Sequence, residues 1–277
     1  FPVQKLYHYG RDTLPALDEA YVQLGTLGGG NHFIELQEDQ QGYLGIMVHT
    51  GSRNFGFKVA NHFNRVAKEL NRKMASQVPP EFDLAYLPLG TKEAQGYVGW
   101  MNFALAFARH NRERIMERVQ EIVFAGLKRY GAVVDIQIST EVNAHHNYAS
   151  KERHFGEDVW VHRKGAIRAE LGELAIIPGA MGSYSFIVEG LGNPESFHSA
   201  SHGAGRVMGR KEAVRRFSVD QVLADFRAKQ VVLGKKRKAD AAEEFYEAYK
   251  NIEDVMADQV DLVKPVLKLE TVAVVKG

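Results

Sequence analysis

The chain has 277 residues, of which 45% are hydrophobic and 25% charged, and it contains no cysteine. These proportions are typical of an ordinary globular protein. The absence of cysteine excludes disulfides and zinc sites built on thiolates. The formal net charge of +1 gives no overall basicity, so any nucleic-acid surface must be local. No apolar run approaches the ~20 residues of a membrane span, and we expect a cytoplasmic protein without a membrane segment.

The first half of the chain predicts two short strands followed by two helices. Residues 33–36 and 44–48 are apolar runs of strand length, each beside a histidine. Apolar residues recur at helical spacing over 63–74, and the Pro79-Pro80 pair ends that helix. A long helix is expected over about 92–129. One apolar stripe is expected to be its buried side: Met101, Leu105, Ile115, Val119, Ile122 and Leu127.

The second half alternates irregularly between predicted strands and helices. Strands are expected over 133–138 and 271–275, and several more within 158–192, where Pro178-Gly179 marks a turn. A capping box of Ser218 and Gln221 predicts a helix over 218–232, and another helix is expected over about 239–260. A basic run, 235–238, separates them. Since neither a repeat nor a flexible linker divides the chain, we expect a single α+β domain over 1–277.

Four short segments combine histidine with small or polar residues. They are Gly28-Gly29-Gly30-Asn31-His32, Val48-His49-Thr50-Gly51-Ser52-Arg53, Asn143-Ala144-His145-His146-Asn147 and Ser201-His202-Gly203-Ala204-Gly205-Arg206. Small residues let a phosphate approach the backbone closely, and arginine binds a phosphate with two hydrogen bonds. A histidine held at that phosphate can be its ligand, its proton donor or its nucleophile.

Each segment also has a purely structural interpretation, and the residues alone leave both open. Asn31 and His32 suit a capped turn equally well, and His49 by itself suits a surface turn. Adjacent histidines on a strand point to opposite faces, so at most one of His145 and His146 is expected to face a site.

Histidines at three separate strand ends, in a chain without cysteine, predict an imidazole-rich site for a divalent metal. Zinc, manganese, iron and copper all accept imidazole, so the residue types do not choose among them. Residues 180–185 offer hydroxyls and amides that suit a phosphate or a base, and they suit a plain turn as well.

In this order, the segments resemble the RtcB family of RNA-splicing ligases. The likeness runs from about residue 21 to the last residue, and its specificity comes from the order of its motifs. The matching motifs are Gly28-Gly29-Gly30-Asn31-His32-Phe33-Ile34-Glu35, Val48-His49-Thr50-Gly51-Ser52-Arg53, Val142-Asn143-Ala144-His145-His146-Asn147-Tyr148, His162-Arg163-Lys164-Gly165-Ala166, Pro178-Gly179-Ala180-Met181-Gly182, Ser201-His202-Gly203-Ala204-Gly205-Arg206 and Val275-Lys276-Gly277.

The resemblance implies one RtcB-like domain with mixed β-sheets flanked by helices, acting as a GTP- and manganese-dependent ligase. Such an enzyme joins an RNA 3′-phosphate, or a 2′,3′-cyclic phosphate after opening, to a 5′-hydroxyl in tRNA splicing or RNA repair. By motif position His202 becomes guanylylated and passes the guanylate to the RNA 3′-phosphate, and the 5′-hydroxyl then expels GMP. Two metals about 4 Å apart would neutralise the triphosphate. The resemblance leaves room for an activating protein partner.

The remaining roles are carried over by motif position. The implied metal ligands are His32, His49 and His146. The implied contacts of GTP, by side chain or backbone, are Asn31, His32, Phe33, Ile34, Glu35, His146, Asn147, Pro178, Gly179, Ala180, Met181, Ser185, Gly203, Ala204, Gly205, Tyr249 and Lys276. Basic side chains position an RNA backbone without reading its sequence, and the implied set is Arg53, Lys164, Arg206 and Arg210.

Two departures from the family pattern stand out. The family carries an aspartate and a bridging cysteine upstream of the Gly-Gly-Asn-His motif, whereas here only 27 residues precede Gly28 and cysteine is absent. Because the first residue is Phe1, we expect that an N-terminal segment is missing. Ala180 stands where the family usually has serine, which removes one hydroxyl from the nucleotide pocket.

Two other functions remain compatible with these residues. A metal-dependent phosphodiesterase or nuclease would also place histidines and arginine around a phosphate, but it would act without GTP. An inactive nucleotide- or RNA-binding module would bind GTP or RNA without forming covalent guanylate on the protein.

Overall fold

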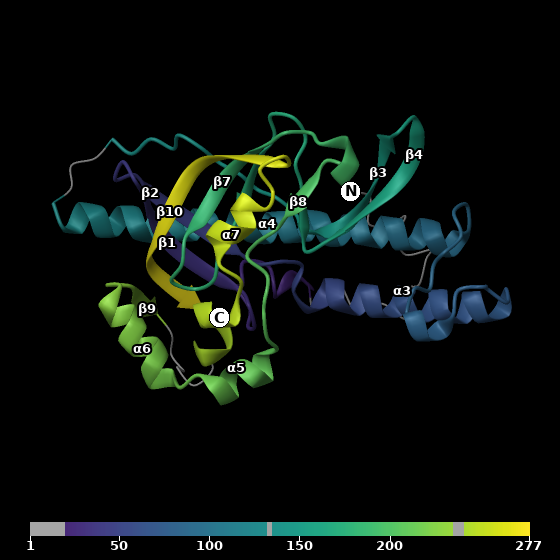
Figure 1. Cartoon of the computed structure of the whole chain (residues 1–277), viewed down its shortest axis with the longest axis horizontal. Helices are drawn as coiled ribbons and strands as arrows, with labels where there is room; N and C mark the ends of the chain where they lie inside the picture. Colours follow the sequence, from purple (N-terminus) through teal and green to yellow (C-terminus); the bar gives the residue numbers. More distant parts are fainter. Residues whose placement is uncertain (1–19, 132–134, 235–240) are drawn as a thin grey trace. The chain divides into compact units, whose positions relative to one another are not determined.

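The computed structural model describes residues 20–131, 135–234 and 241–277, which form a mixed α+β fold as predicted (Figure 1). The chain separates into two compact units, Phe1–Gly28 with Thr50–Val123, and Gly29–His49 with Phe124–Gly277. We call them the helical unit and the sheet unit. The expectation that residues 1–277 act as one domain stays a prediction.

The helical unit is a hairpin of two helices, α3 (Arg53–Lys73) and α4 (Lys92–Arg129). The loop between them contains the 3₁₀ turn η2 (Pro80–Phe82), which begins at the predicted proline break. Phe55 and Phe63 of α3 pack against Trp100 of α4 in the core of this unit. None of the helices in the described part of the chain is both long and apolar enough to span a membrane.

The buried side of α4 differs from the predicted stripe. Met101 and Ile115 of the predicted stripe are buried, but so are Trp100, Ala104, Ala108 and the polar Asn111 outside it, whereas Ile122 of the stripe is exposed. Asn111 accepts a hydrogen bond from Gly25 N at 2.7 Å and donates to Thr26 O at 3.1 Å. A buried amide with backbone partners therefore replaces an apolar side chain in the middle of the helix.

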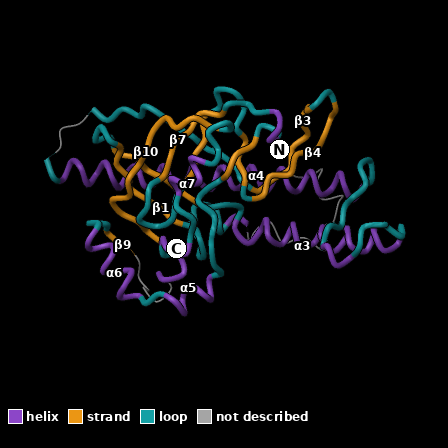
Figure 2. The backbone as a smooth tube through the Cα atoms, in the orientation of Figure 1, coloured by secondary structure: helices purple, strands orange, loops and turns teal. Residues whose placement is uncertain are grey.

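The sheet unit is built on one sheet with the order β2-β1-β10-β7-β6. Figure 2 draws the strands in orange and labels β1, β7, β9 and β10 among them. Neighbouring strands in this order are antiparallel, and the short β9 runs parallel to the end of β10. The strands are β1 (Phe33–Asp39), β2 (Leu44–His49), β6 (Leu174–Ile177), β7 (Ser185–Gly190), β9 (Val232–Gly234) and β10 (Val263–Lys276).

A β-bulge changes which residues of β10 face the interior. Lys276 pairs with Phe33 and Val274 with Glu35, but the register then skips Val272 and places Thr271 opposite Gln37. Cross-strand partners lie on the same face of a sheet, so the bulge brings Thr271 onto the face that carries Lys276. The burial pattern follows, since Thr271, Val274 and Lys276 are buried while Val272 is exposed.

Two short antiparallel ribbons complete the strands. One pairs β3 (Asn147–His154) with β4 (Glu157–Lys164), and the other pairs β5 (Ala166–Arg168) with β8 (Ser199–Ser201). The 3₁₀ turn η3 (Pro194–Ser196) precedes β8. The second ribbon places the residue before β5 and the residue after β8 at the same end, because Ala166 pairs with Ser201.

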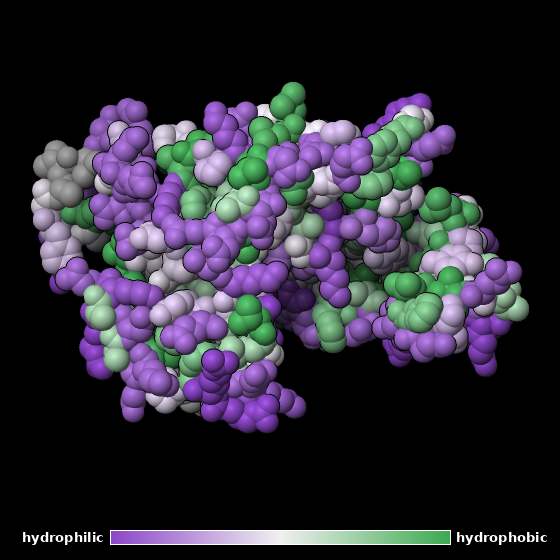
Figure 3. All heavy atoms as spheres, viewed as in Figure 1, coloured by the Kyte–Doolittle hydropathy of each residue, from purple (hydrophilic) through white to green (hydrophobic). Residues whose placement is uncertain are grey.

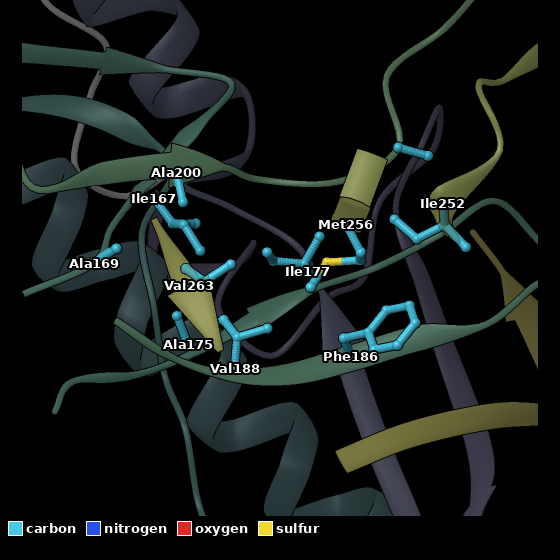
Figure 4. Packing of buried hydrophobic residues seen from close by; sticks show 11 residues of the cluster. Ile167, Ala169, Ala175, Ile177, Phe186, Val188, Ala200, Ile252, Met256 and Val263 are labelled. Atoms are coloured by element: carbon cyan, nitrogen blue, oxygen red, sulfur yellow. The ribbon is translucent and has the colours of Figure 1, made fainter. Parts of the chain in front are cut away.

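Apolar side chains fill two clusters in the sheet unit. In the first, Ile177 and Val188 of the sheet meet Ile252 and Met256 of α7 (Ile252–Ala257), as Figure 4 shows. The second lies among α5 (Arg210–Arg216), α6 (Val219–Ala228) and the 3₁₀ turns η4 (Ala241–Glu244) and η5 (Tyr246–Ala248). Hydrophilic side chains cover much of the face drawn in Figure 3, with exposed apolar residues between them.

Most predicted elements are confirmed, and two are wrong within the described residues. Residues 135–138 are irregular, with Ile138 exposed, while 133 and 134 lie outside the described residues. The single helix expected over 239–260 is replaced by three short elements, η4, η5 and α7. Tyr249 interrupts the helical conformation, because its backbone is extended and forms a bridge to Arg206. Residues 235–240, which include the basic run, also lie outside the described part.

Replacing the N-cap of α6 tests the capping box. Ser218 accepts a hydrogen bond from Gln221 N, and the Gln221 side chain accepts one from Ser218 N. We expect Ser218→Ala to lower the free energy of unfolding by about 1 kcal/mol, measured by urea denaturation. Ser52→Ala at the start of α3 is the control, because among the described residues Ser52 makes no side-chain cap bond. Equal losses in the two variants would contradict the prediction.

Candidate functional site

Four histidines from distant parts of the sequence gather in the sheet unit. His32 precedes β1, His49 ends β2, His146 precedes β3 and His202 follows β8. The ring centroids of His32 and His49 lie 6.1 Å apart, those of His49 and His146 5.2 Å, and those of His146 and His202 4.9 Å. The structure therefore brings the predicted nucleophile and the three predicted metal ligands into one cluster, which we call the histidine cluster.

The register of the sheet places the histidine cluster beside Lys276. Phe33 pairs with His49 on one side and with Lys276 on the other, so these three side chains share a face. The Phe33 and His49 rings are stacked, with centroids 5.2 Å apart. His146 belongs to an irregular segment, and the expected strand leading into it is replaced by β3 beginning at Asn147.

His49 is held as a neutral imidazole. Burial, followed by the nearby imidazoles of His146, His32 and His202, lowers the pKa of His49 to about 3. The neutral form is the one that binds metals, so the donor chemistry of the cluster suits a divalent cation. Within residues 20–131, 135–234 and 241–277, however, no group of three or more His, Cys, Asp or Glu side chains is arranged to hold a metal ion.

His202 has a defined tautomer. Its Nδ1 lies 2.7 Å from Gly165 O, and because a carbonyl only accepts, Nδ1 carries the proton. The other ring nitrogen, Nε2, therefore keeps its lone pair when the ring is neutral. Gly165 has φ of +69°, and a Cβ atom there would lie 3.3 Å from His202 Cε1. Glycine at this position thus permits both the left-handed backbone and the close approach of the ring.

A buried polar group lies on the same sheet face. Gln37 Nε2 donates to Glu35 Oε2 at 2.9 Å and to Ser185 Oγ at 3.1 Å. Thr271 Oγ1 donates to Glu35 Oε2 at 3.3 Å. Burial raises the pKa of Glu35 to about 8, against the opposing hydrogen bonds of Thr271 and Gln37 and the charge of Lys276. Glu35, Ser185 and Lys276, which the resemblance implies as GTP contacts, are thus all buried.

Two loops predicted to line the nucleotide pocket lie against each other. Ala204 N donates to Pro178 O at 3.2 Å, and a Cβ atom on Gly203 would lie 2.9 Å from the same oxygen. Gly179 N donates to Ser185 Oγ at 3.4 Å, which connects these loops to the buried polar group. The predicted backbone segments 178–181 and 203–205 are therefore adjacent, and a side chain on Gly203 would separate them.

Tyr249 and Arg206 share a carboxylate. Arg206 lies 4.8 Å from the centre of the Tyr249 ring and donates to its hydroxyl at 2.9 Å and to Glu244 Oε1 at 3.3 Å. The Tyr249 hydroxyl donates to Glu244, and Arg210 Nε lies 3.4 Å from Glu244 Oε1. Much of the hydrogen-bonding capacity of Arg206 is thus used within the protein, and its contact with RNA stays a prediction.

The other predicted polar contacts are more dispersed. Asn31, Asn147 and Lys164 are exposed, and Asn147 Oδ1 accepts a hydrogen bond from Gly165 N at 3.2 Å. Arg53 belongs to the helical unit, where it donates to Thr26 Oγ1 at 3.1 Å and Leu27 O at 3.2 Å.

Sequence reasoning missed several polar residues of the site. Gln37 and Glu244 are buried, and Thr271 reaches Glu35 only through the β10 bulge. The signal for Gln37 was its place two residues after Glu35, since polar side chains at i and i+2 share one face of a strand. No local pattern marks Thr271 or Glu244.

Comparison with known proteins places the chain in one protein family. The family model described as "tRNA-splicing ligase RtcB" matches residues 10–277. The chain is 42% identical over 258 residues to "RNA-splicing ligase RtcB" of Escherichia coli (strain K12), covering 93% of this chain and 62% of the relative. It is 33% identical over 293 residues to "tRNA-splicing ligase RtcB" of Pyrobaculum aerophilum, covering 92% and 60% respectively. The chain thus spans about 60% of the length of these relatives.

The raised pKa of Glu35 predicts a pH-dependent stability. Its folded pKa of about 8 exceeds the ordinary value of 4.5, so the folded state binds the proton more tightly. The free energy of unfolding should therefore fall on the order of a few kcal/mol as pH rises from 4.5 to 8. Urea denaturation across this range measures the fall, which Glu35→Gln should abolish. Glu270→Gln, at an exposed position of β10, should leave the fall in unfolding free energy unchanged. If the fall persists in Glu35→Gln, Glu35 is not the group that causes it.

Proposed function

Because the chain belongs to the RtcB family of RNA-splicing ligases, we propose that it joins RNA 3′-phosphate or 2′,3′-cyclic phosphate ends to 5′-hydroxyl ends. The reaction uses GTP and manganese and serves tRNA splicing or RNA repair. The observation that carries the proposal is the tautomer of His202, whose Nδ1 is bound to Gly165 O at 2.7 Å while Nε2 keeps its lone pair.

His202 is the nucleophile of the first step. Its Nε2 attacks the α-phosphorus of GTP, so that a P–N bond forms while the bond to the pyrophosphate leaving group breaks. The phosphoramidate then transfers GMP to the RNA 3′-phosphate, and attack by the 5′-hydroxyl releases GMP and joins the strands. A covalent protein intermediate divides one difficult substitution into easier ones. Hydrogen bonding of Nδ1 to Gly165 O stabilises the positive charge that the ring gains during attack.

The buried polar group is the base-binding end of the site. Glu35, Ser185 and Lys276 contact guanine or ribose, and Tyr249 stacks on the base. Support comes from the hydrogen bonds of Gln37 to Glu35 and Ser185, which fix both side chains before a ligand arrives. The loops 178–181 and 203–205 supply backbone contacts, and Asn31 and Asn147 approach the phosphates.

The histidine cluster is the metal-binding end. His32, His49 and His146 are the ligands from this chain, and the lowered pKa of His49 keeps its ring in the ligating form. Bound manganese would neutralise the charge of the triphosphate. Lys164, Arg206, Arg210 and Arg53 are the RNA phosphate contacts.

Removing the nucleophile tests the proposal directly. Incubation with α-labelled GTP and manganese should leave an acid-labile, base-stable label on the denatured protein, as expected for a phosphoramidate. His202→Ala should lose the label while keeping its thermal unfolding temperature. His110→Ala, which removes an exposed ring on α4, should keep it. Undiminished labelling of His202→Ala would show that another residue is the nucleophile.

If the chain binds GTP but neither the parent nor any variant becomes labelled, the residues of this chain alone do not carry out the guanylylation of His202. The same assay with the upstream segment of a relative added back then separates two cases. Recovery of the label supports the ligase, and continued absence of the label supports a binding module.

Replacing Lys276 tests the base-binding end. Lys276→Ala should raise the GTP concentration for half-maximal labelling about tenfold and reduce the preference for GTP over ATP, because a buried cation beside the base site is lost. Lys264→Ala, on the exposed face of β10, is the control. An unchanged preference in Lys276→Ala would remove this residue from the base contacts.

A further inference from the structure

Arg163 lies in a matching family motif, yet the proposed GTP, metal and RNA contacts make no use of it. It is part of β4, and only 2% of its surface is exposed. A buried guanidinium is retained only when its donors are satisfied, so its partners indicate what it does. Those partners come from β3 and from the segment that leads into β8.

On one side Arg163 forms a two-pronged ion pair with Glu152 of β3. Nη1 lies 2.5 Å from Oε1 and Nη2 lies 3.0 Å from Oε2. Glu152 also accepts hydrogen bonds from Ser150 and, at 3.0 Å, from His154 Nε2. Burial alone would raise the pKa of Glu152, but the bonds from Arg163, Ser150 and His154 outweigh it and lower that pKa to about 2. The ion pair therefore anchors the guanidinium within the first ribbon.

On the other side Arg163 binds the three residues before Ala200. Nε donates to Ser199 Oγ at 2.9 Å, and Nη2 donates to Phe197 O at 2.9 Å and His198 O at 3.4 Å. Phe197 and His198 have φ of +53° and +48°, the left-handed region, which is unfavourable for a residue with a side chain. Hydrogen bonds to both carbonyls hold this strained turn in place.

The strained turn determines where His202 lies. Ser199 is the first residue of β8, and His202 follows the last. The acceptor of His202, Gly165, lies two residues after Arg163, between the end of β4 and the start of β5. Arg163 therefore connects the segment that leads into β8, which His202 follows, to the end of β4, which Gly165 follows.

We propose that Arg163, anchored by Glu152, is a positioning residue that keeps Nδ1 of His202 on Gly165 O and so presents Nε2 to the nucleotide. This inference rests on the proposed function for its catalytic consequence. Its neighbour Lys164 is exposed and suited to RNA, whereas Arg163 is buried and acts through His202.

Three variants loosen the arrangement by different amounts. Ser199→Ala removes one hydrogen bond, Glu152→Gln removes the anchoring charge, and Arg163→Lys removes the planar fork that binds carboxylate and carbonyls together. The matched control is Arg168→Lys, since Arg168 forms a similar two-pronged pair with Glu173 on an exposed part of β5.

Single-turnover labelling of the full chain with GTP separates positioning from folding. The maximal rate should fall about 10- to 100-fold in Arg163→Lys and less in Ser199→Ala, because small displacements of a reacting group have large effects. The GTP concentration at half-maximal rate should change by no more than about twofold, as expected when nucleotide binding is intact. The control should match the parent chain.

Nitrogen-15 NMR of the histidine rings gives a readout that does not require activity. His202, assigned by loss of its signals in His202→Ala, should show protonated Nδ1 in the parent chain and mixed tautomers in Arg163→Lys and Ser199→Ala. If the variants lose thermal stability but keep both the tautomer and the labelling rate, the positioning role is overturned. Should Arg163→Lys not fold, Ser199→Ala carries the decision. A parent chain that labels neither alone nor with the upstream segment added back overturns the ligase proposal, and the tautomers then decide the positioning role.

Discussion

The backbone hydrogen bonds of β10 are the constraint on which the sheet unit depends. This 14-residue strand pairs with β7 through its first half and with β1 and β9 through its second. Because register fixes the face of every side chain, its pairing with β1 decides which polar groups meet Glu35 and which residue lies across from Phe33. The buried polar group around Glu35 and two members of the histidine cluster, His32 and His49, thus share one origin, since they lie on or beside β1 and β2 of the sheet that β10 joins.

The sheet unit contains two carboxyl groups, the buried Glu35 and the half-buried Glu152, that are held in opposite protonation states. Glu35 receives hydrogen bonds from the neutral groups of Gln37 and Thr271, and burial dominates, so its proton is held strongly. Glu152 faces the guanidinium of Arg163 and stays charged. A protonated carboxyl can donate a hydrogen bond as well as accept one, whereas a carboxylate that is fully paired acts as a structural support.

Sequence patterns predicted local features well and long-range ones poorly. The capping box at Ser218 depends on residues that are close in the chain, and the structure contains it. The Pro79-Pro80 pair is expected to end the first helix, but α3 ends earlier, at Lys73, and only the short turn η2 begins at Pro80. The histidine cluster joins residues that are far apart in the sequence, so its assembly depends on the fold. The strand expected over 133–138 is irregular where it is described, because apolar character alone does not provide a pairing partner. The contacts of Arg163 join residues 11 and 36 positions away, which no periodicity reveals.

The β10 bulge also determines where the length of this strand can vary during evolution. Val272 is exposed, and its loss would leave Thr271 four positions from Lys276, a spacing that places two side chains on the same face of a regular strand. The pairing of Val274 with Glu35 and of Thr271 with Gln37 could then persist without the bulge, so Thr271 and Lys276 would keep the face that they have now. A relative that is one residue shorter at the bulge is therefore expected to keep the same buried neighbours of Glu35, which makes the exposed valine the dispensable position of this strand.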